Sequence, residues 1–253
     1  MKIHSCIQGT TEWAELRSGI PTASQFSRII TPRGKASDSA EMYLFELLAE
    51  RILGQPTVTH TSHWMDRGSE KEEEAVSFYE FLRDDLGTVK VGFITNDAGT
   101  IGASPDRLVG DKGLLEIKVG KPATHMGLLL KSGSAYEKHK IQAQGQLWVA
   151  EREWNDLLAY NPGLPPALYR VDRDEEFIAL LESAVGAFSG MLEDLFLDCV
   201  QRGWVQERHR GELSETELSA LRDRYLKDRY QIGDPYDLKH LPPLEELVKS
   251  AQK

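Results

Sequence analysis

The stretch Gly113–Val119, which reads Gly-Leu-Leu-Glu-Ile-Lys-Val, predicts a strand that carries both apolar and chemically active side chains. Side chains two positions apart in a strand point to the same face, so Glu116 and Lys118 lie together while Ile117 packs into the core. Glu116 interrupts a strand that would otherwise be buried, where an acid is costly unless it binds something. Before it stands Ser104-Pro105-Asp106, which places a second acid at the end of a neighbouring predicted strand.

These residues have the chemistry of a magnesium site that hydrolyses DNA. Mg²⁺ prefers oxygen ligands, which are expected here from Asp106, Glu116 and the backbone carbonyl of Ile117, with waters completing the octahedron. Mn²⁺ is expected to substitute, because it accepts the same kinds of ligand. Lys118 would then hold or deprotonate the attacking water beside the metal.

The short motifs are weak evidence when taken alone. A bare Glu-x-Lys occurs by chance about once per 250 residues, and the chain contains a similar triplet, Asp237-Leu238-Lys239, in a proline-flanked segment without a strand pattern. Ser104-Pro105-Asp106 alone is more often only a turn. The apolar strand around Glu116 is what favours the functional interpretation.

Glu72 lies in an acidic helix that the sequence predicts from about Asp66 to Asp85. The residues expected to face inward are Ala75, Phe78, Tyr79 and Leu82. A run of acids on a helix is usually a solvated face. Because Glu72 stands three positions before Ala75 and four before Val76, it shares the apolar side and is a candidate third carboxylate of the metal site.

Gln142 and Gln146 are four positions apart in a helix predicted over about Ser134–Glu151, so they share one face. Their neutral amides can bond a phosphate or a metal-bound water without adding charge. An ordinary polar helix surface explains this stretch equally well.

The order of the predicted elements indicates an α/β fold in which helices flank a central sheet. A helix is expected from near Asp38 to Leu53, since Asp38 and Glu41 have capping-box spacing and Gly54 ends the apolar pattern. A β-meander is predicted from the strands Val89–Thr95, Thr100–Ala103, Arg107–Val109 and Gly113–Val119. The later elements are strands near Trp154–Tyr160 and Leu168–Asp172 and a helix over about Glu175–Gln201.

Composition places the 253-residue chain among ordinary globular proteins, with 40% hydrophobic and 28% charged residues. We expect one domain over residues 1–205 and a C-terminal helical extension and tail over 206–253, with a charged helix at 213–230. The two cysteines, Cys6 and Cys199, cannot build a zinc or iron–sulfur cage. Neither a signal peptide nor a membrane span is recognisable, so a cytoplasmic location is expected.

The formal net charge of -10 argues against bulk attraction to nucleic acid or to an anionic membrane. The acid is unevenly distributed, however, because residues 101–150 carry seven basic and four acidic side chains, a net charge of +3. This distribution predicts a local positive site for one strand of nucleic acid within a repulsive exterior.

Five blocks in order resemble one known family. The blocks are Trp13…Leu16-Arg17-Ser18-Gly19…Thr22-Ala23-Ser24, then Gly68…Glu72…Ala75, then Ser104-Pro105-Asp106, then Glu116-Ile117-Lys118, and last Gln142-x-Gln144. Together they are similar to the phage lambda exonuclease and YqaJ-type viral recombinases, over roughly residues 10–200. The resemblance implies a restriction-endonuclease-like core with a central mixed β-sheet.

The resemblance also implies roles for single residues. Those of the metal site are Asp106, Glu116 and the Ile117 carbonyl as ligands, Glu72 as the helical carboxylate, Lys118 as the catalytic lysine and Gln142 as the active-site glutamine. Those that bind a 5′ phosphate are Arg17, Ser24 and Ser104, although a lone arginine could also form a surface ion pair. Trp13 is a candidate to stack on the terminal base pair, with a core tryptophan as the alternative.

The activity implied is a Mg²⁺-dependent 5′→3′ exonuclease that acts on double-stranded DNA ends and leaves a 3′ single-stranded overhang for strand annealing. A trimeric ring, a single-strand-annealing recombinase partner and a phage or prophage origin are expected with it. The alternatives are a structure-selective endonuclease of the same superfamily and a catalytically inactive DNA-end-binding protein. The sequence departs from the family at Val119-Gly120-Lys121, which precede Pro122, so the path of residues 120–133 stays open.

Overall fold

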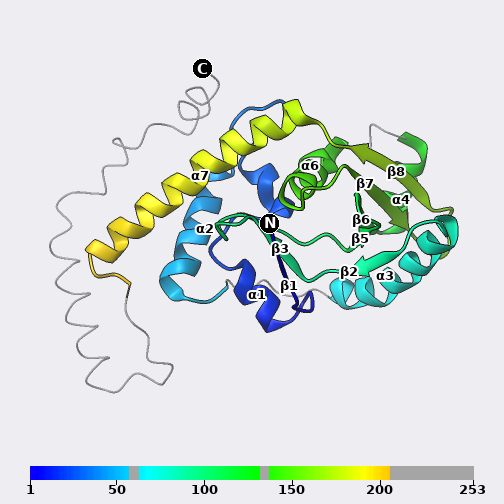
Figure 1. Ribbon diagram of the computed structural model, residues 1–253, viewed down its shortest axis with the longest axis horizontal. Coiled ribbons are helices and arrows are strands. Elements are labelled where there is room, and N and C mark those ends of the chain that lie inside the picture. Colours follow the sequence, from blue (N-terminus) through cyan, green and yellow to red (C-terminus); the bar gives the residue numbers. More distant parts are fainter. Residues whose placement is uncertain (57–62, 132–136, 206–253) are drawn as a thin grey trace.

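The computed structural model describes residues 1–56, 63–131 and 137–205, and it describes no side chains for residues 63–70 and 138. Its larger sheet is mixed and five-stranded, and it lies in the right-hand part of the molecule in Figure 1. Its order is β2 (Thr88–Lys90), β5 (Arg107–Val109), β6 (Gly113–Val119), β7 (Trp154–Tyr160) and β8 (Ala167–Asp172). The β6 and β7 strands pair in parallel and the other pairs are antiparallel. The predicted central mixed sheet flanked by helices is therefore confirmed.

A second, three-stranded sheet replaces part of the predicted β-meander. It has the order β1 (Lys2–His4), β3 (Phe93–Thr95) and β4 (Gly102–Ala103). The prediction of one meander is wrong because the chain leaves the large sheet between β2 and β3. At that point Gly92 lies so close to Cys6 that a Cβ atom would come within 2.0 Å of the Cys6 carbonyl oxygen. Only a glycine permits this approach, which breaks the expected strand Val89–Thr95.

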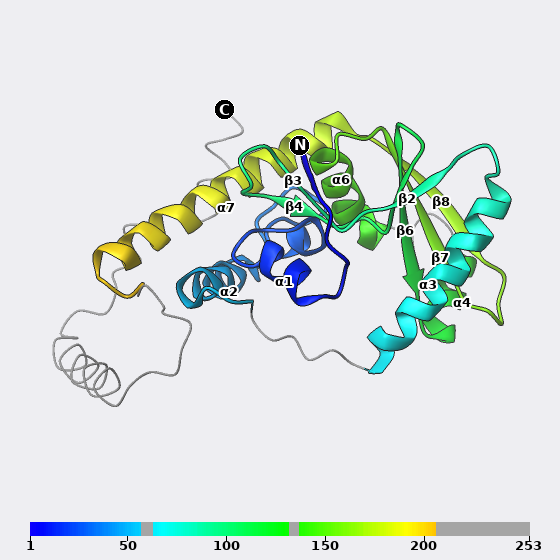
Figure 2. The ribbon, with the colours of Figure 1, turned by 60° about the horizontal axis from the view of Figure 1, so that its bottom comes forward.

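Helices cover both faces of the five-stranded sheet. Helix α3 (His63–Leu82) lies across one face (Figure 2), where Ala75 and Tyr79 pack with Leu115 and Leu158 of the central strands. On the other face, Leu128 of α4 (Pro122–Lys131) and Ala143 of α6 (Lys140–Val149) pack against β7. The α6 helix follows the short 3₁₀ helix η2 (Glu137–His139).

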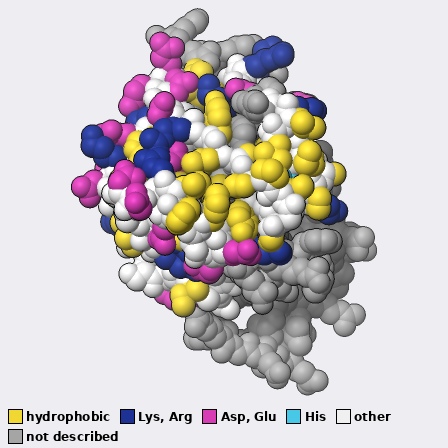
Figure 3. All heavy atoms as spheres, turned by 90° about the vertical axis from the view of Figure 1, so that its right-hand side faces the viewer, with side chains coloured by type: hydrophobic (Ala, Val, Ile, Leu, Met, Phe, Trp, Pro, Cys, Tyr) yellow, Lys and Arg dark blue, Asp and Glu magenta, His cyan; other side chains and the backbone are white. Residues whose placement is uncertain are grey.

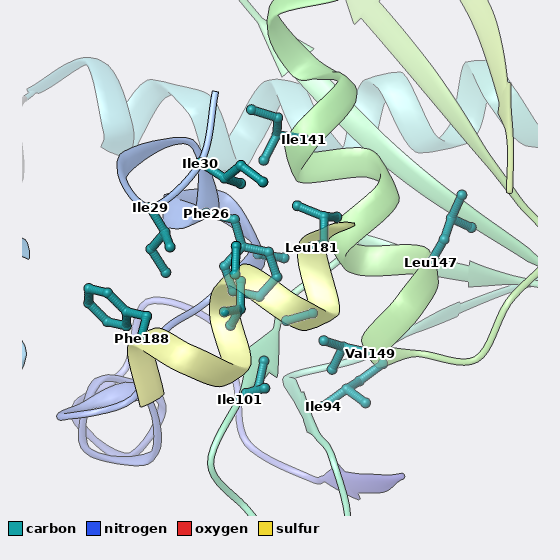
Figure 4. Packing of buried hydrophobic residues seen from close by; sticks show 14 of the residues in the cluster. Phe26, Ile29, Ile30, Ile94, Ile101, Ile141, Leu147, Val149, Leu181 and Phe188 are labelled. Atoms are coloured by element: carbon teal, nitrogen blue, oxygen red, sulfur yellow. The ribbon is translucent and has the colours of Figure 1, made fainter. Parts of the chain in front are cut away.

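The main hydrophobic core joins the small sheet to α6 and to three further helical segments. These are the 3₁₀ helix η1 (Ala23–Arg28), α2 (Ala40–Leu53) and α7 (Glu175–Gln201), whereas α1 (Thr11–Arg17) contributes no buried residue. Figure 4 shows Phe26 of η1 packed among side chains of α6 and α7. At Gly145 of α6 a Cβ atom would lie 2.6 Å from the Phe26 ring, so this glycine allows α6 and η1 to pack closely.

Several predicted elements match the structure within a few residues. The β6, β7 and α7 bounds agree with the expected ones, and β8 begins one residue earlier. Helix α2 ends as expected at Gly54, which has the left-handed φ of 62°. The Asp38–Glu41 capping box is wrong, since the N-cap is Ser39 and no side-chain bond caps the helix.

The second predicted helix is present with different bounds, because α3 ends at Leu82 rather than at Asp85. Ala75 and Tyr79 face inward as expected and Phe78 is half-buried, but Leu82, the last residue of the helix, is 46% exposed. The structure also contains β1, α1 and α4, which the sequence patterns did not predict. Helix α4 occupies most of the stretch 120–133 whose path was open.

The predicted tail, residues 206–253 with its helix at 213–230, lies outside the described residues, and so do residues 134–136 of the helix predicted to begin at Ser134. Within the described part of the chain, no helix is long and apolar enough to cross a membrane. Apolar side chains do gather on the face near the α3, α4 and β8 end of the molecule (Figure 3). The exposed residues of these elements include Phe81, Leu130, Leu168 and Tyr169.

Candidate active site

Asp106 and Glu116 face each other across two paired strands. Arg107 of β5 pairs with Leu115 of β6, so the next position along the register sets Asp106 opposite Glu116. Asp106 Oδ2 accepts a 2.6 Å hydrogen bond from the backbone N–H of Ile117, which fixes the Ser104-Pro105-Asp106 turn to β6. The two carboxylates therefore lie together, as the strand pattern predicted.

Glu116 is buried, and polar side chains surround its carboxylate. Its Oε1 accepts hydrogen bonds from Lys118 Nζ at 2.6 Å and from Gln142 Nε2 at 2.7 Å, and its Oε2 accepts one from Gln146 Nε2 at 2.6 Å. Lys118 Nζ also donates to Gln142 Oε1 at 3.0 Å. Glu116 and Lys118 thus share one face of β6, and the two glutamines reach them from one face of α6. The alternative of a plain polar helix surface is wrong, since Gln146 is only 1% exposed.

Glu72 approaches this cluster from α3. Its Oε1 lies 3.5 Å from Arg107 Nη1, and its neighbour Glu73 pairs with Arg107 Nη2 and with Lys90, each at 2.8 Å. Glu73 is exposed, whereas Glu72 is half-buried on the side that faces the sheet. The buried guanidinium of Arg107 also donates to the Asp106 carbonyl oxygen at 2.7 Å, so it joins α3 to the strand that carries Asp106.

Burial and the charges of the neighbouring carboxylates both disfavour the ionised form of these acids. Burial raises the pKa of Asp106 well above its ordinary value of 3.8, and the negative charges of Glu116 and Glu72 raise it further. Burial also raises the pKa of Glu72, against the opposing charges of Arg107 and Lys90. A divalent cation between these oxygens would relieve the repulsion.

The donor set agrees with a hard cation such as Mg²⁺, because it consists of carboxylate oxygens, with the Ile117 carbonyl on the same strand. The carboxylate side chains do not form a complete set of metal ligands in the positions that the structure gives them. Within the ranges that the structure describes, no group of three or more His, Cys, Asp or Glu side chains could hold a metal ion as it stands. Two close acids fit Mg²⁺, which usually keeps several waters as its remaining ligands.

A second cluster, here called the cation cluster, consists of Trp13, Arg17 and Ser104. The Ser104 hydroxyl accepts hydrogen bonds from Trp13 Nε1 at 3.0 Å and from Arg17 Nη1 at 3.1 Å. The Arg17 guanidinium stacks 4.1 Å from the centre of the Trp13 ring. Burial lowers the pKa of Arg17 from its ordinary value. Among described residues, Arg17 bonds to Ser104 rather than forming the surface ion pair that was its alternative role.

Trp13 is half-buried, so it does not belong to the buried core that was its alternative role. Ser24 lies on η1, and its hydroxyl is 3.4 Å from that of Thr22. Thr22 forms a bridge to Gly102, two residues before Ser104, which brings η1 beside the cation cluster. Among described residues, no hydrogen bond joins Ser24 to Arg17 or Ser104.

Three residues that the sequence analysis did not select also support the carboxylate site. They are Arg107 and Glu73, described above, and Asn155 of β7, whose Nδ2 donates to Gln146 Oε1 at 2.7 Å. Asn155 is fully buried in a strand that is otherwise largely apolar. The argument that selected Glu116, a polar residue inside a buried strand, applies equally to Asn155 and could have found it.

A mixed sheet with an acid, a second acid and a lysine on adjacent strands, flanked by helices, defines a nuclease-type α/β fold. The family model for the YqaJ-like viral recombinase domain matches residues 12–153, and the chain belongs to this family. A search of curated proteins found no match.

Solved structures agree with this assignment. The alkaline exonuclease LHK-Exo from Laribacter hongkongensis is 31% identical, with a TM-score of 0.68 over 77% of this chain and 98% of that one. The same enzyme in complex with dAMP gives 32% identity and a TM-score of 0.69 over the same shares. A phage-related exonuclease from Haemophilus somnus 129PT is 18% identical, with a TM-score of 0.57 over 71% of this chain and 96% of that one, and supports the fold alone.

Proposed function

We propose that this chain is a Mg²⁺-dependent exonuclease that digests one strand of double-stranded DNA from a 5′ end and leaves a 3′ single-stranded overhang for recombination by annealing. The observation that carries the proposal is the turn Ser104-Pro105-Asp106, which joins the cation cluster to the carboxylate site. The exonuclease relatives and the recombinase family support the same reaction class.

In this proposal the metal ligands are Asp106, Glu116, the Ile117 carbonyl and Glu72. When bound, Mg²⁺ or Mn²⁺ supplies an activated water and neutralises the charge on the leaving oxygen. Lys118 holds the attacking water as an ammonium, or takes the proton of that water when it is the neutral amine; its Nζ lies 2.6 Å from Glu116 and 3.0 Å from Gln142. Gln142 keeps this Nζ in place and adds an amide for the scissile phosphate.

The proposed polarity depends on the cation cluster. Arg17 supplies a forked cationic donor, and the hydroxyls of Ser104 and Ser24 add neutral donors for a terminal 5′ phosphate. Because Ser104 and Asp106 are two residues apart, a phosphate held at the first would place a nearby phosphodiester at the second. The net charge of +3 over residues 101–150 favours entry of a single strand.

The assembly is also part of the proposal. We expect a homo-oligomer, a trimeric ring by the family resemblance, with a single-strand-annealing recombinase as a partner and the cytoplasm of a host bacterium as its location. The apolar face near α4 and β8 supports association, because exposed apolar patches usually mark protein contacts. Light scattering on the purified chain measures the number of copies.

The deciding experiment is a time course on linear duplexes labelled at either end, with and without a 5′ phosphate and with and without Mg²⁺. The proposal expects release of 5′-terminal nucleotides first, faster from phosphorylated ends, and no product without the metal. A closed circular duplex is the control, since cleavage of the circle would indicate the endonuclease alternative. The inactive end-binding alternative predicts retention of the duplex without any acid-soluble product.

A further inference from the structure

The two oxygens of the Glu116 carboxylate are held in different ways. The donors to Oε1 are Lys118 and Gln142, which are both partly exposed. The single donor to Oε2 is Gln146, which is 1% exposed and lies at 2.6 Å. A ligand that approaches from solvent can therefore displace the donors at Oε1, while the donor at Oε2 has nowhere to move.

Asn155 fixes the orientation of the Gln146 amide. Glu116 can only accept when ionised, so Gln146 must turn its NH₂ group toward Oε2 and its carbonyl oxygen away. That carbonyl oxygen accepts a 2.7 Å hydrogen bond from Asn155 Nδ2. Asn155 is fully buried, and its own Oδ1 has no hydrogen-bond partner within the described part of the chain. A buried polar atom left unsatisfied is costly, which indicates that Asn155 is placed for its donor side.

We propose that Gln146, with Asn155 behind it, reserves Oε2 so that Glu116 offers a divalent cation one oxygen, and that this makes the site select Mg²⁺ over Ca²⁺. The inference rests on the metal dependence of the proposed function. Mg²⁺ requires near-octahedral geometry and is commonly bound through one oxygen of a carboxylate. Ca²⁺ takes six to eight oxygens and often binds both oxygens of one carboxylate, so a reserved Oε2 disfavours it.

Gln146 is thus a positioning residue, which acts through Glu116 rather than on the substrate. A neutral amide suits this role because it occupies Oε2 without neutralising the carboxylate. A lysine or arginine in its place would add a second positive charge beside that of Lys118 and so weaken the attraction for a cation. A merely structural hydrogen bond would change the stability of the fold but not the choice between the two metals.

The test compares Gln146→Met, which removes the donor and keeps the volume, with wild type. Direct titration calorimetry with MgCl₂ and with CaCl₂ on the full chain without DNA gives the two dissociation constants. In Gln146→Met the affinity for Ca²⁺ relative to Mg²⁺ should rise about tenfold, because loss of a partner behind a ligand usually changes metal affinity by about that factor. Asn155→Ala, which frees the Gln146 amide to rotate, should shift the ratio in the same direction by less.

Gln144→Met is the matched control. Gln144 is as buried as Gln146 on the same helix, but it bonds to the backbone of Asp172 and Asp174 instead of to Glu116. Its loss should lower the melting temperature without changing the ratio. An unchanged ratio in both Gln146→Met and Asn155→Ala, with wild type binding and using Mg²⁺, overturns the inference alone. A wild-type chain that binds neither cation overturns the proposed function as well.

If Gln146→Met does not fold, Gln146→Asn provides the same measurement. Asparagine keeps the amide but is one methylene shorter, so it withdraws the donor from Oε2 while filling most of the buried space. A rise in the Ca²⁺ to Mg²⁺ affinity ratio in this variant supports the proposal, and a wild-type ratio contradicts it.

Discussion

Ser104 and Asp106 are two residues apart, yet they belong to regions of opposite charge. The Ser104 hydroxyl lies under a guanidinium and an indole N–H. Burial raises the pKa of Asp106, and the neighbouring carboxylates raise it further. Pro105 between them is held by Gln8, whose Nε2 donates at 2.9 Å to both the Pro105 and the Val91 carbonyl oxygens. This short turn, held in place by Gln8, therefore sets the spacing between the cation cluster and the carboxylate site.

The two regions also share a feature, since neutral groups supply many of the contacts to their charged side chains. Arg17 is held by a hydroxyl and an aromatic ring, and Glu116 is held by two amides in addition to its ion pair with Lys118. Neutral partners orient a charged group while leaving its charge for a ligand. Asp156, in the same sheet as Glu116, is different. Both of its carboxylate oxygens accept hydrogen bonds from Arg170, so its charge is used within the fold. Surplus charge thus distinguishes a binding site from a buried ion pair.

The largest effect is expected at the carboxylate site, from Lys118→Ala. Removal of the ammonium should lower the digestion rate on the order of 10²–10⁴-fold, the usual contribution of a positioned proton-transfer group. Binding to duplex ends should persist, because the cation cluster is intact. Rate and end binding are measured on the same preparation. Lys112→Ala is the control, since Lys112 pairs with Glu153 at the far end of β6. Substantial residual digestion by Lys118→Ala would contradict the mechanism.

A substitution in the cation cluster should change the choice of substrate rather than the rate of the chemical step. Arg17→Met should reduce the preference for a 5′-phosphorylated end about 10–100-fold, since a hydrogen bond to a charged group contributes about 1.5–3 kcal/mol. Digestion of unphosphorylated ends should change little. The measurement is the ratio of rates on the two substrates, with Arg202→Met, whose guanidinium pairs with Asp198 on α7, as the control. Equal loss on both substrates would show that Arg17 does not read the phosphate.

The sequence predicted the carboxylate site better than the cation cluster, for a physical reason. Strand periodicity and a costly buried acid are local signals, and they located Asp106, Glu116 and Lys118. The bonds from Arg17 and Trp13 to Ser104 span 87 and 91 residues. No local pattern encodes that distance, so those residues were selected only through the family resemblance.

The fold shows the same limit. The long elements β6, β7 and α7 were predicted closely because their apolar patterns are continuous. The division into two sheets was missed because it depends on the contact between Gly92 and Cys6, which joins distant parts of the chain. Contacts of this kind are set by tertiary packing rather than by local propensity.

The ionised carboxylate of Asp106 should lower the free energy of unfolding in the absence of metal. Asp106→Asn should raise the melting temperature in metal-free buffer at neutral pH. The folded chain raises the pKa of Asp106, so ionisation costs stability once the pH exceeds the ordinary value of 3.8. Relief of about 1 kcal/mol corresponds to a rise of about 2–4 °C for a domain of this size.

The direction of this change in stability can be checked by varying the pH. Below pH 3.8 the aspartate is protonated in both the folded and the unfolded chain, so the advantage of Asp106→Asn should vanish there and grow as the pH rises. Glu73→Gln should behave in the opposite way, because hydrogen bonds from Lys90 and Arg107 lower the pKa of Glu73. Its ionised form stabilises the fold above the ordinary pKa of 4.5, and that contribution is lost on acidification. Melting curves of Asp106→Asn, Glu73→Gln and wild type, recorded from below pH 3.8 to neutral pH, measure both effects.

The smallest effect separates two roles for Trp13 in the cation cluster. Trp13→Phe removes the hydrogen bond to Ser104 but keeps a ring under Arg17, so the preference for a 5′ phosphate should fall only about 2–10-fold, as for one neutral hydrogen bond. Trp13→Ala also removes the stacking and should lower both the preference and the melting temperature.

Processivity per folded molecule decides whether the Trp13 ring also contacts the DNA, because a ring that wedges against the terminal base pair is needed at every step of digestion. If Trp13→Ala keeps wild-type processivity while its stability falls, the ring only supports Arg17 and Ser104. If processivity falls in Trp13→Ala but not in Trp13→Phe, an aromatic face contacts the DNA.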